Sequence, residues 1–131
     1  MAVLPLLGDE AASVKARTVF DDIRAKRGTD YVNNFWRAMA HDPDGLHALW
    51  AEMQTTMAEG AIPALMKELI YVAVSTANGC SYCIHSHTAS AKAKGMTPQM
   101  HAELLAVIAM ASRTNALATA LQVPVDERFQ T

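Results

Sequence analysis

The two cysteines of the chain, Cys80 and Cys83, lie three residues apart, and His87 follows the second cysteine by four residues. In a helix that begins near Ser81, a rotation of about 100° per residue places all three side chains within an arc of about 60° and puts His85 on the far side. Cysteines with this spacing at a helix start have a Cα separation within the roughly 4.4–6.8 Å that a disulfide requires. The spacing therefore predicts a dithiol that can form a disulfide without rebuilding the backbone.

The predicted position of the cysteines, in the first turn of a helix, favours thiolate chemistry. Unpaired backbone N–H groups and the positive end of the helix dipole stabilise an anion there. A thiolate is the nucleophile toward peroxides and disulfides. Because His87 stands one helical turn beyond Cys83, its imidazole can exchange a proton with that sulfur, so we expect Cys83 to attack. Cys80 is then the thiol that condenses with a Cys83 sulfenic acid to give a disulfide.

A carboxylate lies among apolar residues in the helix predicted before the cysteines. Glu68 belongs to residues 63–78 and neighbours Leu65, Leu69 and Val72, so it needs a polar partner. If the cysteine helix folds back antiparallel after a turn at Gly79, Glu68 comes close enough to His87 for their side chains and a water to close the gap. We expect Glu68 to orient and polarise the imidazole. We also expect the apolar surroundings to raise the pKa of Glu68, which would make it a proton shuttle.

Glycine and proline separate segments of helical length, and no sustained alternating pattern predicts a strand. We expect an all-α fold of about six helices in a single domain, residues 1–131. The expected helices cover residues 9–26, 31–40, 42–60, 63–78, 81–95 and 97–121, with a possible bend or break at 112–115 and a tail from 123 to 131. Thr97 and Asp42 are the predicted N-caps of two of them.

Composition limits the classes of partner. The chain has 11 basic and 13 acidic residues, a formal net charge of −2, 51% hydrophobic and 18% charged residues. This balance gives no electrostatic footprint for nucleic acid or an anionic membrane. The small polar fraction leaves little polar surface for a monomer, so we expect a homo-oligomer.

No stretch of about 18 uninterrupted apolar residues predicts a membrane span. Residues 1–8 carry no basic residue and only a short apolar run, so we expect no signal peptide and a cytoplasmic location. In a reducing compartment, two cysteines at this spacing are more often catalytic or metal-binding than a permanent crosslink.

Zinc binding is the main alternative chemistry, within a binding or redox-sensing module that is not an enzyme. A structural zinc site needs four convergent ligands. His85 and His87 point about 160° apart on a helix, so both cannot join the cysteines. We therefore expect no metal and no organic cofactor. His85 faces solvent or a subunit contact, and Tyr82 and His85 are candidates for a substrate pocket.

The motif residues match a known pattern. Glu68, Cys80, Cys83 and His87, with the runs Asn-Gly-Cys-Ser-Tyr-Cys from 78 and Lys-Glu-Leu-Ile from 67, resemble the AhpD-like alkylhydroperoxidases of the carboxymuconolactone decarboxylase superfamily. The resemblance extends from about Val32 to the region of Asn115.

The resemblance implies a helical fold that assembles as trimers or hexamers and an antioxidant enzyme that reduces hydrogen peroxide or alkyl hydroperoxides. It also implies roles: Cys80 as proton donor and resolving thiol, Cys83 as the sulfenic acid, and Glu68 and His87 as the proton relay. The reductant implied is a thiol or a lipoyl-bearing partner. The best characterised peroxidases of the family are longer and have a further His at the position of Tyr82. A lactone decarboxylase, with His87 and Glu68 as acid and base, is the alternative enzyme, although that reaction has no use for a dithiol.

Overall fold

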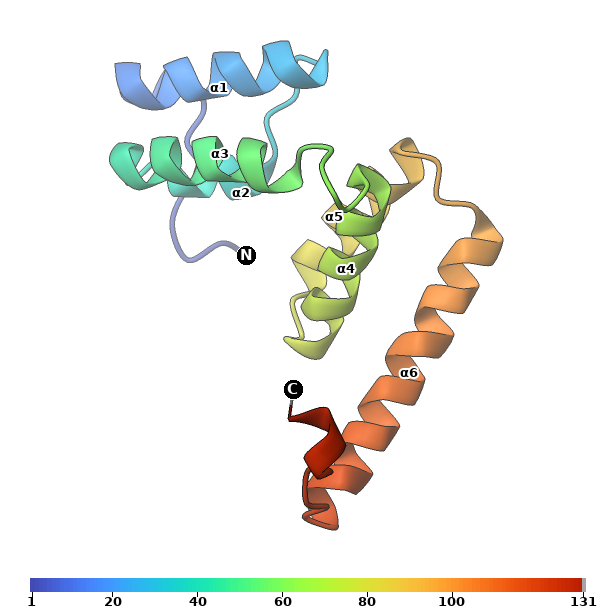
Figure 1. The fold of residues 1–131 in the computed structure, drawn as a ribbon. Helices are drawn as coiled ribbons and strands as arrows, with labels where there is room; N and C mark the ends of the chain where they lie inside the picture. Colours follow the sequence, from blue (N-terminus) through green and yellow to red (C-terminus); the bar gives the residue numbers. More distant parts are fainter. Residues whose placement is uncertain (131) are drawn as a thin grey trace. The chain divides into compact units, whose positions relative to one another are not determined.

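The structure is a computed structural model that describes residues 1–130, and within that range it contains six α-helices, a short 3₁₀ helix and no β-strand (Figure 1). The helices are α1 (Val14–Arg27), α2 (Asn34–Met39), α3 (Pro43–Met57), α4 (Ala64–Ala77), α5 (Ser81–Ala93) and α6 (Pro98–Ala120). The predicted all-α fold of six helices is therefore confirmed.

The chain divides into two compact units, Met1–Ala58 and Glu59–Thr131. The first contains α1 to α3 and the second contains α4 to α6. Each unit is described by itself below. The single domain expected for residues 1–131 stays a prediction.

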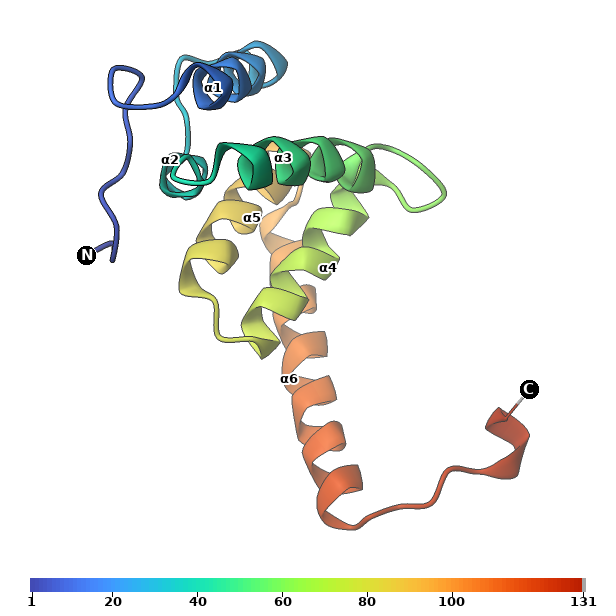
Figure 2. The ribbon, with the colours of Figure 1, turned by 90° about the vertical axis from the view of Figure 1, so that its left-hand side faces the viewer.

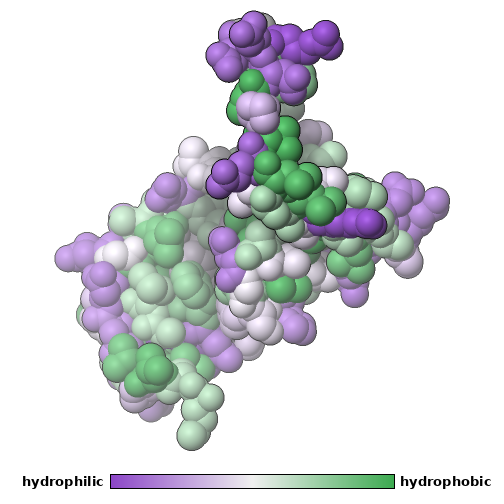
Figure 3. All heavy atoms as spheres, turned by 90° about the horizontal axis from the view of Figure 1, so that it is seen from below, coloured by the Kyte–Doolittle hydropathy of each residue, from purple (hydrophilic) through white to green (hydrophobic). Residues whose placement is uncertain are grey.

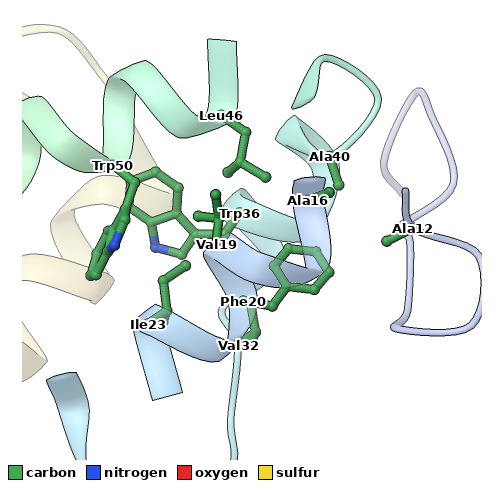
Figure 4. Packing of buried hydrophobic residues seen from close by; sticks show 10 residues of the cluster. All are labelled: Ala12, Ala16, Val19, Phe20, Ile23, Val32, Trp36, Ala40, Leu46 and Trp50. Carbon is green, nitrogen blue, oxygen red and sulfur yellow. The ribbon is translucent and has the colours of Figure 1, made fainter. Parts of the chain in front are cut away.

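The first unit is built around an apolar cluster of α1, α2 and α3. From α1, this cluster includes the buried residues Val19, Phe20 and Ile23. Trp36 and Trp50 pack edge to face in the same cluster, with ring centroids 5.2 Å apart, a favoured geometry for aromatic pairs. Figure 4 shows the ten buried members of this cluster: Ala12, Ala16, Val19, Phe20, Ile23, Val32, Trp36, Ala40, Leu46 and Trp50.

The ends of the helices in this unit follow their capping residues. Asp42 accepts a hydrogen bond from the backbone N–H of Gly45 at 3.0 Å, as expected of the N-cap of α3. The predicted start of the first helix at residue 9 is wrong, because the hydroxyl of Ser13 caps α1 by accepting from the N–H of Ala16. Asp9 lies before this cap and instead binds Arg24 through both carboxylate oxygens, each at 2.7 Å. The second helix is also shorter than the predicted 31–40.

In the second unit, α4 and α5 form an antiparallel pair, and both ribbon views show them side by side (Figures 1 and 2). Leu69, Ala91 and Met96 form a small buried cluster, against which Leu65, Met100 and Leu104 pack. Only one side of α4 is buried within the unit: Met66, Ile70 and Val74 are each about half exposed, at 48%, 46% and 53%. Within this unit, α4 is therefore covered on one of its two apolar faces and open on the other.

Helix α6 continues unbroken through residues 112–115, so the possible bend there is absent. The Thr114 hydroxyl donates to the carbonyl of Met110, which lets a residue of low helix propensity satisfy its side chain within the helix. The predicted N-cap, Thr97, accepts from the N–H of Met100 at 3.1 Å. No residue of α6 is buried, and the helix extends well past α4 and α5 (Figure 2).

After α6, the described part of the predicted tail contains one 3₁₀ turn, Glu127–Phe129. Residue 131 of that tail lies outside the described residues. Among residues 1–130, no helix combines the length and the apolar character needed to cross a membrane.

Candidate active site

A tight chain reversal between α4 and α5 positions the first cysteine. Gly79 adopts a positive φ of 68°, which costs glycine nothing. The N–H of Cys80 then donates to the Ser75 carbonyl at 2.9 Å and the N–H of Gly79 to the Thr76 carbonyl at 3.1 Å, the two bonds of a Schellman motif. Cys80 therefore ends the capping motif of α4 and is at the same time the N-cap of α5.

The two cysteines form a disulfide within the first turn of α5, with a Cα separation of 5.3 Å. The expected pairing geometry is thus present in the structure. The backbone N–H of Cys83 also donates to the sulfur of Cys80 at 3.2 Å. This bond satisfies one of the unpaired N–H groups of the helix start.

Glu68 of α4 and His87 of α5 are in direct contact. The side chain of Glu68 is 4% exposed, and its Oε2 lies 2.7 Å from Nδ1 of His87. The antiparallel return of the chain after Gly79 therefore brings these residues together as expected, with no bridging water needed. Since a carboxylate can only accept, Nδ1 of His87 is the donor and Nε2 is left as the second ring nitrogen available for proton transfer.

Two further residues, which the motif did not reveal, bind the other oxygen of Glu68: Ser90 of α5 and Lys94, the residue directly after the end of α5. The hydroxyl of Ser90 donates to Oε1 at 2.8 Å, and the ammonium of Lys94 donates to the same oxygen at 2.9 Å. Lys94 also contacts the Ser90 hydroxyl at 3.0 Å. His87, Ser90 and Lys94 follow each other at intervals of three and four residues, which places them on one helix face. That periodicity is the sequence signal by which they could have been found.

These donors set the charge state of Glu68. Burial alone raises the pKa of this carboxyl, but the hydrogen bonds from His87, Lys94 and Ser90 and the charge of Lys94 outweigh burial and lower the pKa from 4.5 to about 2. The expectation of a raised pKa is therefore wrong. It assumed a carboxyl surrounded only by apolar side chains, whereas three polar groups converge on it. Glu68 is a fixed anion at neutral pH, which does not suit a proton shuttle.

Tyr71 of α4 is the other site residue that the sequence did not indicate. Its ring stacks on the imidazole of His87, with centroids 3.5 Å apart and planes 17° apart. It lies three residues after Glu68, so the two side chains project from neighbouring positions on α4 and contact the same imidazole. His87 is consequently held at Nδ1 and on one ring face.

The two pocket candidates occupy the outer part of the helix start. His85 is exposed, and its Nδ1 donates to the carbonyl of Ser81 at 2.8 Å, one turn earlier in α5. Tyr82 is 44% exposed. A substrate contact by either residue stays a prediction.

Within residues 1–130, no group of three or more His, Cys, Asp or Glu side chains is arranged so that it could hold a metal ion. In the structure both sulfurs, the expected soft ligands of zinc, are joined to each other. The Glu68 carboxylate accepts hydrogen bonds from all three donors that converge at this site: an imidazole, a hydroxyl and an ammonium.

The arrangement joins a disulfide at a helix start to a hydrogen-bonded imidazole and carboxylate. Helical side chains point back toward the N-terminus of their helix, so His87 lies over the turn that contains Cys83. The anion of Glu68 fixes the imidazole tautomer, and the imidazole can take up or release a proton near the sulfurs. The site therefore has the groups needed for reversible dithiol and disulfide chemistry.

Comparison with known proteins agrees with this fold. The sequence profile of the carboxymuconolactone decarboxylase family matches residues 43–126, and the chain belongs to that family. A solved structure, the alkylhydroperoxidase AhpD core of Rhodospirillum rubrum, is 57% identical to the chain and superposes with a TM-score of 0.95 over 100% of this chain and 98% of that one. The predicted AhpD-like fold is confirmed.

Two curated relatives match more locally. An uncharacterized protein of Cupriavidus necator is 35% identical over 65 residues, which cover 50% of this chain and 58% of that protein. The uncharacterized protein YdfG of Bacillus subtilis is 35% identical over 57 residues, 44% of this chain and 38% of its own length. The matched part of the chain thus spans between about two fifths and three fifths of these relatives.

Proposed function

We propose that the chain is an antioxidant peroxidase, which reduces hydrogen peroxide or alkyl hydroperoxides through the Cys80–Cys83 dithiol. The observation that carries the proposal is the disulfide at the start of α5 with the hydrogen-bonded Glu68 and His87 pair on the same helix pair. The 57% identical structure described as an alkylhydroperoxidase AhpD core supports the same activity.

The proposed reaction has two steps on the protein. The Cys83 thiolate attacks the outer oxygen of the hydroperoxide, the O–O bond breaks, and the protein is left with a sulfenic acid while the alkoxide takes a proton and leaves as the alcohol. The Cys80 thiol then attacks the Cys83 sulfur, the S–O bond breaks, and one water leaves as the disulfide forms. His87 accepts the Cys83 proton and returns a proton to the leaving oxygen.

The hydrogen bond at the helix start supports the two different roles proposed for the cysteines, with Cys83 as the attacking thiol and Cys80 as the resolving thiol. The Cys83 N–H binds the Cys80 sulfur at 3.2 Å, so the start of α5 stabilises a thiolate at Cys80. A stabilised thiolate suits a resolving group that attacks a sulfenic acid. It also suits a leaving group when the disulfide is reduced, because exchange is faster when the departing sulfur carries charge well.

The cycle closes when two electrons and two protons return to the disulfide. We propose a small thiol or a lipoyl-type dithiol as the reductant, which becomes a disulfide as the protein returns to the dithiol. We propose a cytoplasmic location, where such reductants are available.

We also propose a homotrimer or homohexamer. Met66, Ile70 and Val74 on the outer side of α4 are about half exposed, and α6 has no buried residue although it carries exposed Leu105, Val107 and Met110. Figure 3 shows hydrophobic side chains at the surface of one face of the molecule. An apolar surface of this kind is favourably covered by further copies of the chain.

Stopped-flow oxidation of the reduced protein tests the activity. Hydrogen peroxide, tert-butyl hydroperoxide and cumene hydroperoxide are mixed with the protein, and the loss of thiols and the appearance of alcohol are followed. We expect two thiols lost per peroxide consumed, at a rate far above that of dithiothreitol at the same pH. Cys83→Ser is the matched control and should abolish the fast phase.

Three results would contradict the proposal. One is oxidation no faster than that of dithiothreitol. Another is stoichiometric zinc in the reduced protein, measured beside a thiol count, which would favour the binding or sensing module. The third is release of carbon dioxide from a carboxylated lactone at the same rate by the wild-type protein and a variant without cysteines, which would favour the decarboxylase.

A further inference from the structure

The carboxylate of Glu68 is shared between two kinds of partner. Its Oε2 faces only the imidazole of His87, while its Oε1 receives the Lys94 ammonium at 2.9 Å and the Ser90 hydroxyl at 2.8 Å. His87 and Ser90 come from one face of α5, and Lys94 follows directly at the end of this helix. The carboxylate is 4% exposed and the Lys94 side chain 38% exposed, so the ion pair extends from the interior of the helix pair to its surface.

We propose that Lys94 is a positioning residue that neutralises the Glu68 carboxylate and thereby keeps His87 uncharged, so that His87 can act as the base for the dithiol. This inference rests on the proposed function for the role of His87 as that base. Lys94 is not one of the motif residues, so this role is additional to those that the motif implies.

The argument is one of charge balance in a partly buried site. A buried carboxylate whose only polar partner is a histidine favours the protonated imidazole, because the resulting ion pair has no net charge. Here the carboxylate is already paired with an ammonium. Protonation of His87 would then place two cations around one anion in a medium of low effective dielectric. Lys94 thus opposes the charged form of His87 and favours the form that can accept a proton.

The other groups around His87 do not replace this effect. From α4, Glu68 and the ring of Tyr71 face the imidazole. From α5, the polar neighbours on the same face are Cys83, Ser90 and Lys94, of which Lys94 carries the positive charge. Met100 and Leu104 of α6, which pack against the buried cluster of this unit, are apolar. The low pKa of Glu68, about 2, agrees with a carboxylate that stays ionised throughout.

The test is an NMR pH titration of the His87 ring in the reduced protein, without peroxide. In Lys94→Met, which keeps the length of the side chain and removes the charge, we expect the titration midpoint of the His87 ring to move upward by about one pH unit. Lys94→Arg should restore the wild-type midpoint. Lys92→Met is the matched control, because it removes the same charge from the same helix two residues away, and it should leave the midpoint unchanged.

Lys94→Gln separates charge from hydrogen bonding, since its amide can still donate to Oε1. We expect it to move the midpoint upward as Lys94→Met does. A midpoint that stays at the wild-type value in Lys94→Gln, or that moves equally in Lys92→Met, would overturn the inference. If circular dichroism shows that Lys94→Met does not fold, the midpoint in Lys94→Gln serves as the test in its place.

The titration is independent of peroxide chemistry. If the reduced protein reacts with no peroxide but the midpoint moves in Lys94→Gln, the proposed function fails while the electrostatic effect of Lys94 on His87 stands. If the peroxide reaction is fast and the midpoint does not move, the proposed function stands and the role of Lys94 is overturned.

Discussion

Oε2 of Glu68 lies 2.7 Å from Nδ1 of His87, although the two residues are 19 positions apart in the sequence. The chain reversal at Gly79 is what closes this distance, and it also sets Cys80 at the start of α5. The positions of the Glu68 carboxylate, the His87 imidazole and the two sulfurs therefore all depend on this turn.

Glu68→Gln should destabilise the protein by about 2–4 kcal/mol, because the Lys94 ammonium and the His87 imidazole lose the buried anion that they share. The measurement is urea unfolding of the oxidised protein at pH 7 and fixed protein concentration. Glu103→Gln, on the exposed surface of α6, is the matched control and should change the free energy of unfolding by less than about 0.5 kcal/mol. Equal effects of the two variants would show that the contacts of Glu68 contribute nothing to the free energy of unfolding.

The same carboxylate predicts a loss of stability in acid. The pKa of Glu68 is lowered from 4.5 to about 2 on folding, so its contribution is complete above pH 4.5 and is lost as the pH falls toward 2. That contribution is at most about 3 kcal/mol. Urea unfolding of wild type and Glu68→Gln between pH 5 and pH 2 should show the difference between them shrinking as the pH falls. A difference that is constant with pH would contradict the lowered pKa.

The assignment of Cys83 as the attacking thiol can be tested by trapping sulfenic acid with dimedone. After treatment with one equivalent of peroxide, Cys80→Ser should carry the adduct on Cys83, because no resolving thiol is present to remove it. Cys83→Ser should carry little or none. An adduct on the Cys83→Ser protein and none on Cys80→Ser would reverse the two roles, and mass spectrometry of the tryptic peptides reads the result directly.

His87→Gln should slow oxidation of the dithiol by peroxide about 10²–10⁴-fold while the fold is retained, because the base that takes up the thiol proton is lost. Stopped-flow thiol loss at pH 7 measures the rate, and circular dichroism checks the helix content. His47→Gln, at an exposed position of α3, is the control and should react as the wild type does. Unchanged kinetics in His87→Gln would remove the imidazole from the mechanism.

Tyr71 should act through its ring and not through its hydroxyl, since the ring stacks on the imidazole at 3.5 Å. Tyr71→Phe keeps the stack and should leave the rate of peroxide oxidation nearly unchanged. Tyr71→Ala removes an aromatic contact of about 0.5–1.5 kcal/mol and should slow the reaction by about threefold to tenfold. A larger loss in Tyr71→Phe than in Tyr71→Ala would instead assign the function to the hydroxyl.

The outer face of α4 should lie in a subunit interface. Light scattering of the purified protein should give a trimer or a hexamer, and Ile70→Lys should shift it toward smaller species, because a charge buried without a partner is costly. Thr88→Lys, at a partly exposed position of α5, is a control for the added charge. A monomeric wild type would contradict the proposed assembly.

The sequence predicted the parts of the site that follow from local rules. Helix periodicity, the Asp42 and Thr97 caps and the turn at Gly79 were enough to foresee six helices and the approach of Glu68 to His87. The start of α1 was missed because Asp9 resembles a cap, whereas the Ser13 hydroxyl actually caps the helix.

The sequence could not predict contacts that depend on the relative register of α4 and α5. A shift of one turn in this register would have placed Lys94 beyond Glu68 and Tyr71 away from His87. The low pKa of Glu68 follows from that register, because three donors reach the carboxylate only at this alignment. The helix face shared by His87, Ser90 and Lys94 was visible in the sequence, but its partner on α4 was not.

The two helices that carry the site follow each other directly in the chain, and every chemical group described lies between residues 68 and 94. Contacts of such short sequence separation require little loop closure and form early and fast in folding. The reactive groups therefore all lie on one helical hairpin, whose internal contacts can form before the long-range contacts of the chain are made.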